Sequence, residues 1–196
     1  MAVIILAGGE SRRLGRDKAW QTVGGIALIT RVLDAAAEIP GDIFIVANDP
    51  DKYDQLAGRA TLKRDEAPNL GPLGGLYTGL LATSDRDNLL LPCDAPFLNP
   101  KLLAYLLDRL PGHEAVVPEY KGRAHPAIAA YATTCLPAIE KQLALGNLKV
   151  NSFFPDVSIK YLDEAAISEV DPDGLSFFNV NTATDLAEAE CLAGSR

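Results

Sequence analysis

The sequence predicts an α/β fold, a three-layer α/β/α sandwich in which helices cover both faces of a mostly parallel sheet. Short apolar runs of strand length alternate with longer segments of helical character through the first half of the 196-residue chain. Glycine and proline mark many of the boundaries between them. Such alternation is typical of a parallel sheet, because neighbouring parallel strands must be joined by a crossover segment. With 48% hydrophobic residues, the chain can also bury a substantial core.

The first half of the chain contains four strand-length apolar runs. We expect strands at Val3–Leu6, Ile43–Val46, Leu62–Lys63 and Leu89–Leu91. The segments that separate and follow them predict helices at Ile26–Ala37, Asp51–Ala57, Leu73–Ala82 and Pro100–Leu110. Gly71-Pro72 marks the start of the third helix, and Asn99 is a natural N-cap for the fourth, which has Pro100 in its first turn.

After Gly112 the pattern changes. Two strands, Ala115–Pro118 and Ala127–Ala132, flank a polar turn at Glu119 to His125, which favours a hairpin. Further along we expect a helix, a strand, a short apolar segment and a final helix, at Thr134–Ala144, Val157–Leu162, Phe177–Asn179 and Thr184–Leu192. No repeat or linker interrupts the chain, so residues 1–196 are expected to form a single domain.

Composition narrows the class of protein. Three widely spaced cysteines without a C-x-x-C pair argue against a disulfide framework or a zinc site, and they suit a reducing cytoplasm. A pI near 4.7 argues against nucleic acid as a partner. The N-terminal apolar run is too short for a signal peptide, and no segment approaches the ~20 apolar residues that cross a bilayer. We therefore expect a cytoplasmic protein whose partners are small molecules.

A glycine-rich basic loop follows the first strand. Gly8-Gly9 permits close backbone approach to a ligand, and four cations stand against two anions between Glu10 and Lys18, in a chain of net charge −8. Free N–H groups in such a loop bind anions, most plausibly a nucleoside triphosphate. The Walker pattern and the dinucleotide G-x-G-x-x-G pattern are both absent. An ordinary surface turn is the alternative, but the strand, double glycine, Ser-x-Arg and Asp-Lys occur together.

Three more motifs lie near the carboxyl ends of predicted strands, where open α/β sheets bind ligands. Asn48 could contact a base edge or a ribose, or form a plain Asn-Asp-Pro turn. Gly71, Gly74 and Gly75 would allow a base or phosphate to approach the start of a helix, which by itself needs only one glycine. Asp94 is a magnesium-ligand candidate, although an aspartate before a proline turn often only caps the turn.

Two motifs in the second half are candidates for an acceptor site. Arg123, His125 and Pro126 adjoin a predicted strand and offer contacts to an anion or a ring. Asn179 and Asn181 face the same way along an extended segment, with capping of the last helix as the alternative role. Thr182 or Thr184 could cap that helix instead.

The segment from Leu6 to Lys18, Leu-Ala-Gly-Gly-x-Ser-x-Arg-Leu-Gly-x-Asp-Lys, resembles the signature of nucleotidyltransferases with a GT-A-like, Rossmann-like fold. It is most similar to that of the molybdenum cofactor guanylyltransferases, the MobA family. The resemblance implies that Arg13 and Lys18 hold the triphosphate. It assigns nucleotide binding to Leu6, Ala7, Gly8, Gly9, Lys18, Asn48, Asp65, Gly71, Gly74, Gly75 and Asp94.

In that family Asp94 corresponds to the residue that carries Mg²⁺, so the resemblance implies catalysis by Arg13, Lys18 and Asp94. It places Arg123, His125, Pro126, Asn179 and Asn181 in the region that binds the pterin acceptor. The Gly71-Pro72-Leu73 segment and Leu6-Ala7-Gly8-Gly9 favour GTP over CTP, since related cytidylyltransferases show other motifs there. Three positions depart from the family pattern: Leu14 replaces its methionine, which conserves volume, Ala183 replaces its proline and Lys149 its arginine.

The implied reaction is transfer of GMP from GTP to the terminal phosphate of molybdopterin, with or without molybdenum, with Mg²⁺ as cofactor. Residues about 1–112 would bind the nucleotide and about 113–196 the acceptor. Transient contact with molybdenum-insertion proteins or target molybdoenzymes is also expected. One alternative is an enzyme of the same fold that uses CTP or another acceptor such as a sugar phosphate. A second is a carrier of molybdopterin or nucleotide without catalytic activity.

Overall fold

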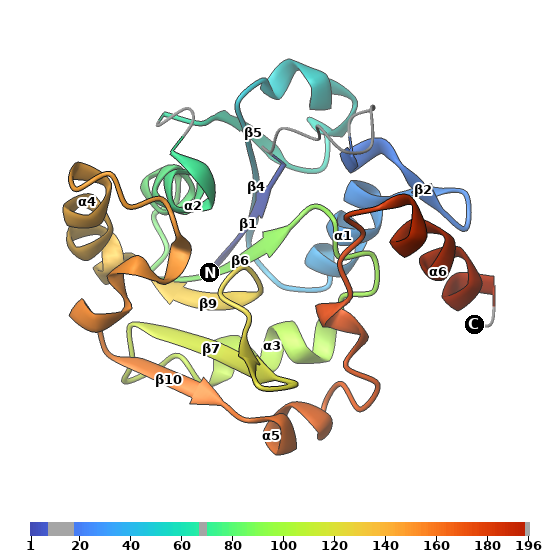
Figure 1. Ribbon diagram of the computed structural model, residues 1–196. Coiled ribbons are helices and arrows are strands. Elements are labelled where there is room, and N and C mark those ends of the chain that lie inside the picture. The colour runs from blue at the N-terminus through green and yellow to red at the C-terminus, as the bar shows by residue number, and fades with distance from the viewer. Residues whose placement is uncertain (8–17, 67–69, 195–196) are drawn as a thin grey trace.

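A computed structural model describes residues 1–7, 18–66 and 70–194 of the chain. Within these ranges one large sheet has the strand order β10-β7-β9-β6-β1-β4-β5, and β8 pairs with β7 at its side (Figure 1). Its strands are β1 (Ala2–Leu6), β4 (Asp42–Ala47), β5 (Thr61–Arg64), β6 (Asp87–Pro92), β7 (Ala115–Tyr120), β8 (Arg123–Ala124), β9 (Ala129–Ala132) and β10 (Ile159–Leu162). A separate small hairpin pairs β2 (Thr22–Val23) with β3 (Ile26–Ala27).

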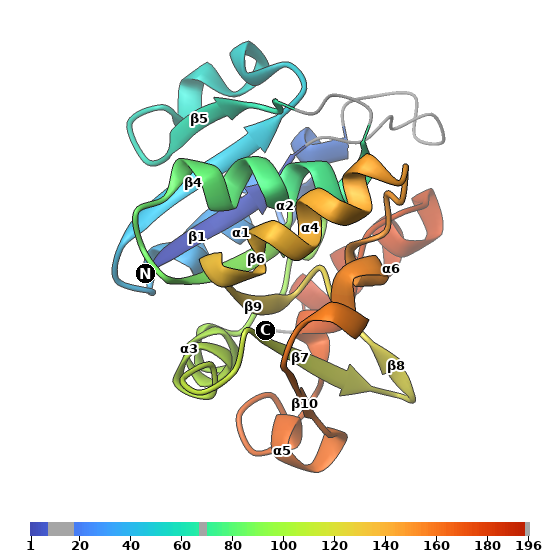
Figure 2. The ribbon, with the colours of Figure 1, turned by 90° about the vertical axis from the view of Figure 1, so that its left-hand side faces the viewer.

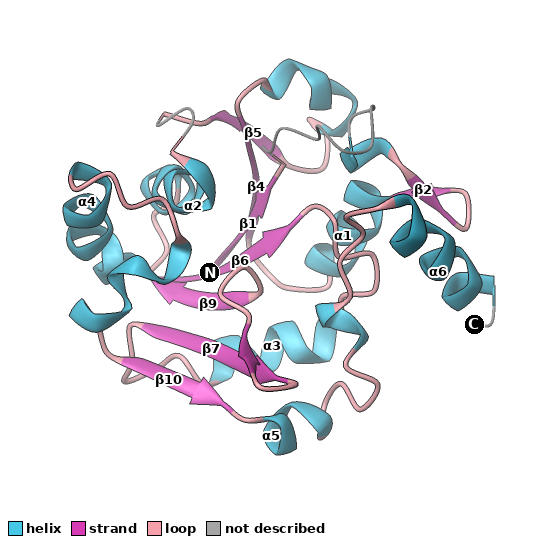
Figure 3. Cartoon of the chain, in the orientation of Figure 1, coloured by secondary structure: helices cyan, strands magenta, loops and turns pink. Residues whose placement is uncertain are grey.

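The central part of the sheet is parallel, as predicted. Strands β6, β1, β4 and β5 run in one direction, whereas β9 runs antiparallel to both β6 and β7, and β10 is parallel to β7. The α-helices are α1 (Leu28–Ala37), α2 (Gly71–Ala82), α3 (Pro100–Asp108), α4 (Leu136–Ala144), α5 (Glu164–Ser168) and α6 (Ala183–Gly194). Figure 3 distinguishes them from the strands.

Two hydrophobic clusters on opposite faces of the sheet make the fold three-layered. Side chains alternate along β1, so Val3 and Ile5 pack in the cluster that includes α1 and α3, and Ile4 packs in the cluster that includes α2 and α4. Figure 2 shows α2 and α4 lying over one face of the sheet. The three-layer α/β/α prediction is therefore confirmed.

Helix α2 lies unusually close to β1 because glycines face the strand. A Cβ on Gly75 would lie 2.7 Å from Leu6 Cδ2, and one on Gly79 would lie 2.4 Å from Ile4 Cγ2. Both distances are shorter than real Cβ contacts, so a larger residue would push the helix outward. Gly75 thus has a packing role, whatever it contributes to ligand binding.

Several boundaries differ from the sequence-based expectations. The helix expected at Ile26–Ala37 begins at Leu28, because Gly24 and Gly25 adopt positive φ (58° and 75°) and turn the chain into the β2–β3 hairpin. The expected helix at Asp51–Ala57 is a 3₁₀ helix, Pro50–Leu56.

The polar turn after β7 is tighter than expected. β7 pairs antiparallel with β9, as the predicted hairpin required, but Lys121 and Gly122 (φ 51° and 69°) first return the chain into β8. Helix α5 was not expected. In the part of the chain that the structure describes, no helix is long and apolar enough to cross a membrane.

Candidate active site

Three polar side chains from distant parts of the chain meet at one point. The Lys18 ammonium forms an ion pair with Asp94 Oδ2 and donates a hydrogen bond to Asn181 Oδ1 at 2.7 Å. Lys18 begins a 3₁₀ turn, Asp94 follows β6, and Asn181 precedes α6. The side chains of Lys18 and Asp94 are each only 17% exposed, so the pair is shielded from bulk water.

The sheet places Asp94 at the carboxyl ends of its parallel strands. Leu6, the last residue of β1, is in register with Pro92, the last residue of β6, and Leu6 O accepts a hydrogen bond from Cys93 N at 3.1 Å. Asp94 O then accepts from Val180 N at 2.9 Å, which ties the segment before α6 to this edge. Asp94 is therefore held by its backbone on both sides, at the edge where ligands bind in folds of this class.

The remaining oxygen of Asp94 is available to a cation. Among the described residues, Asp94 Oδ1 is buried and has no hydrogen-bond partner. A buried carboxylate oxygen without a partner costs free energy unless a cation or a hydrogen-bond donor binds it. Carboxylate oxygens are also the kind of ligand that Mg²⁺ prefers. In the same ranges no group of three or more His, Cys, Asp or Glu gathers. A Mg²⁺ ion here would thus take its further ligands from phosphate oxygens and water, as Mg²⁺ commonly does.

The side chain of Asn181, a predicted acceptor residue, contacts Lys18, and its role toward the acceptor stays a prediction. Its neighbour Thr182 caps α6: Thr182 Oγ1 accepts from Asp185 N at 3.1 Å, and Asp185 Oδ2 accepts from Thr182 N at 2.8 Å. Thr182, one of the two threonines considered for this role, is thus the N-cap. Sequence reasoning missed Asp185, although Thr-x-x-Asp before a helix is a recognisable capping pattern.

Asn179 lies in the same segment but meets different surroundings. Its side chain is partly buried, and Asn179 Oδ1 has no hydrogen-bond partner within the described ranges. The two asparagines therefore do not share one set of contacts, and a role of Asn179 toward the acceptor stays a prediction.

The predicted acceptor residues of the β7–β8 region lie against the segment that leads to Asn181. The ring of His125 packs on Phe177, with centroids 4.4 Å apart, and Phe177 also stacks on Tyr120. Burial lowers the pKa of His125 below its usual value, which favours the neutral imidazole. Arg123 is exposed, and Pro126 O accepts a hydrogen bond from Tyr131 Oη at 2.8 Å. Phe177 thus links the two predicted acceptor motifs.

The predicted nucleotide residues at β4 and β5 lie at the same edge of the sheet. The Asn48 side chain is exposed just beyond β4, and the backbone carbonyl of Asn48 accepts from Arg64 Nη1 at 2.9 Å. Asp65 N donates to Ala47 O at 2.9 Å, while Asp65 Oδ1 accepts from Thr78 Oγ1 of α2 at 2.9 Å. Asp65 therefore fastens α2 to the end of β5 in addition to any ligand contact.

The glycine cluster at the start of α2 also has structural partners. Gly71 adopts φ +62°, and a Cβ there would lie 3.2 Å from Leu148 O. Gly74 N donates to Leu70 O at 3.2 Å. Ala7 O accepts from Tyr53 Oη at 2.8 Å and so anchors the end of β1. The predicted residues Gly8, Gly9 and Arg13 lie outside the described residues, and their roles stay predictions.

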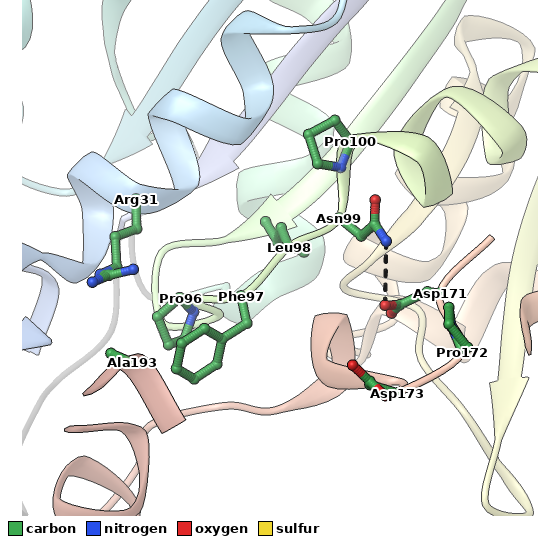
Figure 4. A pocket seen from close by; sticks show the side chains of 10 residues that line it. All are labelled: Arg31, Pro96, Phe97, Leu98, Asn99, Pro100, Asp171, Pro172, Asp173 and Ala193. Carbon is green, nitrogen blue, oxygen red and sulfur yellow. Dashed lines mark hydrogen bonds between the residues drawn. The ribbon is translucent and has the colours of Figure 1, made fainter. Parts of the chain in front are cut away.

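A hollow of about 530 Å³ is lined in part by residues 96–100 of the loop that follows Asp94. None of the predicted site residues lines it. Figure 4 shows Arg31 and Phe97 on one side and Asp171 on the other, with Asn99 Nδ2 3.4 Å from Asp171 Oδ1. Asp171 Oδ2 also accepts from Ser176 N at 3.1 Å. Asp171 therefore links the N-cap of α3 to the segment that precedes Phe177.

The chain is similar to known proteins over most of its length. The family model for the MobA-like NTP transferase domain matches residues 3–156. A molybdenum cofactor guanylyltransferase from Desulfosudis oleivorans is 35% identical over 189 residues, which cover 95% of this chain and 93% of that protein.

Two solved structures share the fold. Molybdopterin-guanine dinucleotide biosynthesis protein A from Archaeoglobus fulgidus has a TM-score of 0.87 and 26% identity, with 100% of both chains covered. The 4-diphosphocytidyl-2C-methyl-D-erythritol synthase from Anaerococcus prevotii has a TM-score of 0.74 at 17% identity, covering 98% of this chain and 95% of that chain. The second likeness concerns the fold alone.

Proposed function

Because the chain belongs to the family of MobA-like NTP transferase domains, we propose that it transfers GMP from GTP to the terminal phosphate of molybdopterin and releases pyrophosphate. Relatives named molybdenum cofactor guanylyltransferase, similar over nearly the whole chain, support the choice of substrates. The observation that carries the proposal is the contact of Lys18 with Asp94 at the carboxyl ends of β1 and β6, where Asp94 keeps one buried oxygen without a partner among the residues that the structure describes.

The proposed reaction is an in-line displacement at the α-phosphorus of GTP. An oxygen of the acceptor phosphate forms a bond to that phosphorus, and the bond to the bridging oxygen of the β-phosphate breaks. A phosphate monoester is largely dianionic near pH 7, because its second pKa is about 6, so no general base is needed. The work of the protein is positioning and charge stabilisation.

The residues around Asp94 divide this work between them. Asp94 would hold Mg²⁺, which when bound neutralises charge on the phosphate groups. Lys18 would bind phosphate oxygens, and Asn181 orients its ammonium through the 2.7 Å hydrogen bond. Low exposure of Lys18 and Asp94 strengthens both electrostatic interactions relative to water.

On this proposal the two halves of the chain have different partners. Residues about 1–112 would bind GTP, and residues about 113–196 would contribute most contacts to the acceptor. The packing of His125 on Phe177, whose segment continues to Asn181, supports an acceptor that spans from the β7–β8 region to the phosphate site.

Product analysis tests the proposal directly. The protein is incubated with Mg²⁺, molybdopterin and one NTP at a time, and the dinucleotide product is identified by mass spectrometry while pyrophosphate release is followed. We expect the guanine dinucleotide and steady pyrophosphate release with GTP. Product with CTP alone would contradict the assignment of the base. Transfer to another phosphate acceptor, such as a sugar phosphate, but not to molybdopterin would contradict the assignment of the acceptor. Binding of GTP or molybdopterin without formation of product would identify a carrier.

A further inference from the structure

The side chain of Asn181 is exposed, yet it has a defined task, because its oxygen accepts a hydrogen bond from Lys18. An exposed asparagine ahead of a helix can adopt several rotamers and backbone conformations. The conformation of Asn181 therefore depends on hydrogen bonds to the backbone around it. Val180 N, donating to Asp94 O at 2.9 Å, fixes the peptide on one side.

Asp185 fixes the peptide on the other side. Its Oδ2 accepts from Thr182 N and from Asn181 N, both at 2.8 Å. A capping box needs only the first of these bonds together with the bond from Asp185 N to Thr182 Oγ1. The second bond reaches one residue further, to the residue that contacts Lys18. This extra bond goes beyond what capping of α6 requires.

The ionisation of Asp185 is consistent with its hydrogen bonds to the backbone. The hydrogen bond from Asn181 N is the largest cause that lowers the pKa of Asp185, and the positive charge of Lys18 adds to it. Asp185 is therefore ionised at neutral pH and lies within the electrostatic reach of Lys18. It has no direct hydrogen bond to Lys18 among the contacts described, so the hydrogen-bonded path from Asp185 to Lys18 runs through Asn181, beside the direct attraction of the two charges.

We propose that Asp185 is a positioning residue for Lys18: through two backbone hydrogen bonds it fixes Asn181, whose side chain orients the Lys18 ammonium toward the phosphate site. The inference rests on the proposed role of Lys18 in binding the triphosphate. It extends that site from the sheet edge into the first turn of α6.

A double-mutant cycle on GTP·Mg²⁺ affinity, measured by calorimetry, tests the inference. We expect Asn181→Ala to weaken binding about 10-fold, since hydrogen bonds to charged groups contribute at least about 1.5 kcal/mol. Asp185→Ala should weaken it by a similar or smaller factor. The double variant should bind no more weakly than Asn181→Ala alone, because the hydrogen-bonded path from Asp185 to Lys18 runs through Asn181 and the loss of a nearby negative charge does not itself weaken the binding of an anionic ligand.

Two variants at the same helix end separate positioning from helix stability. Thr182→Ala removes the capping hydroxyl but keeps both bonds from Asp185 to the backbone, so its GTP affinity should stay within about 2-fold of the wild type. Asp185→Asn keeps an acceptor oxygen and should restore most of the affinity lost in Asp185→Ala. Thermal unfolding confirms that each variant is folded, and Asp185→Ser replaces Asp185→Ala if the latter is not.

Three results would overturn the inference: unchanged affinity in Asp185→Ala, additive losses in the double variant, or an equal loss in Thr182→Ala. Lys18→Met provides the separate check on the proposed function. If Lys18→Met binds GTP as tightly as the wild type, the phosphate role of Lys18 itself is wrong. If Lys18→Met weakens binding but the cycle shows no coupling, only the positioning role of Asp185 fails.

Discussion

At the scale of single residues, the two carboxylate oxygens of Asp94 have different surroundings. One oxygen contacts Lys18, and the other is buried without a partner among the described residues. Burying an unmet carboxylate oxygen costs free energy, so the position is explained best by a ligand that restores the missing interaction. A divalent cation bridging to phosphate is the chemistry that fits an oxygen donor of this kind.

Asp94→Asn should separate the metal role from the structural one. Asparagine keeps the shape of the side chain and can still accept from Lys18, but it lacks the charge that holds Mg²⁺. We expect transfer to fall by at least about 100-fold, in line with the loss of one charge-stabilising group in other enzymes. The affinity for Mn²⁺ in the presence of GTP, measured by electron paramagnetic resonance, should fall with it.

Asp163→Asn is the matched control for that experiment. Asp163 is an exposed aspartate whose side chain accepts from Ala166 N at 2.9 Å as the N-cap of α5. Its replacement should leave Mn²⁺ affinity and transfer unchanged. Near-normal turnover of Asp94→Asn would contradict the metal assignment.

At the scale of elements, glycines allow α2 to lie close to β1. The helix begins beside the carboxyl end of the sheet, and Asp65 joins it to β5 through Thr78. Gly75 and Gly79 let the helix backbone lie against Leu6 and Ile4. The glycine-rich start of α2 is thus explained in part by packing, which the sequence pattern alone does not reveal.

Gly79→Ala tests this packing. Its Cβ would lie 2.4 Å from Ile4 Cγ2 in a buried layer, so α2 must shift or Ile4 must leave its rotamer. Overpacking of this kind lowers the free energy of unfolding by about 1–3 kcal/mol. Chemical denaturation measures the loss. Gly58→Ala is the control, because a Cβ at Gly58 has no neighbour within 4 Å, and equal stability of the two variants would contradict the packing role.

At the scale of the whole molecule, the topology brings the site together. Parallel strands β1, β4 and β6 end at one edge, and the chain returns past Asp94 only after β10, at Val180. The His125 ring is partly buried against Phe177 of this returning segment. The stability of the fold should therefore depend on the protonation of His125.

The direction of this pH dependence follows from the pKa of His125, which burial lowers below the unfolded value of about 6.5. The unfolded chain then binds more protons than the folded chain. The contribution of neutral His125 to the free energy of unfolding is therefore fully present above about pH 6.5 and declines as the pH falls toward the folded pKa. His125→Gln should reduce this decline in thermal unfolding between about pH 7.5 and 5. His113→Gln, which changes the other of the two histidines, should retain it. Identical pH profiles for wild type and His125→Gln would contradict the prediction.

Local patterns in the sequence were sufficient for most of the fold. The unbroken apolar run of β1 predicts a strand covered on both faces, and Asn99 accepts from Lys101 N at 3.0 Å as the N-cap of α3, as predicted. The Ile26–Ala27 strand was wrongly assigned to a helix, because a two-residue strand has no periodicity to detect. Helix α5, with five residues, was missed for the same reason.

The sequence by itself determined the layered α/β class and the polar residues at the strand ends, since both follow from contacts and periodicities that are local in the chain. Only the tertiary structure decided which of those residues meet. Lys18 and Asn181 are 163 positions apart and Lys18 and Asp94 are 76 apart. No local pattern encodes such a pairing, because it depends on the order of the strands and on the path by which the last segment returns to β6.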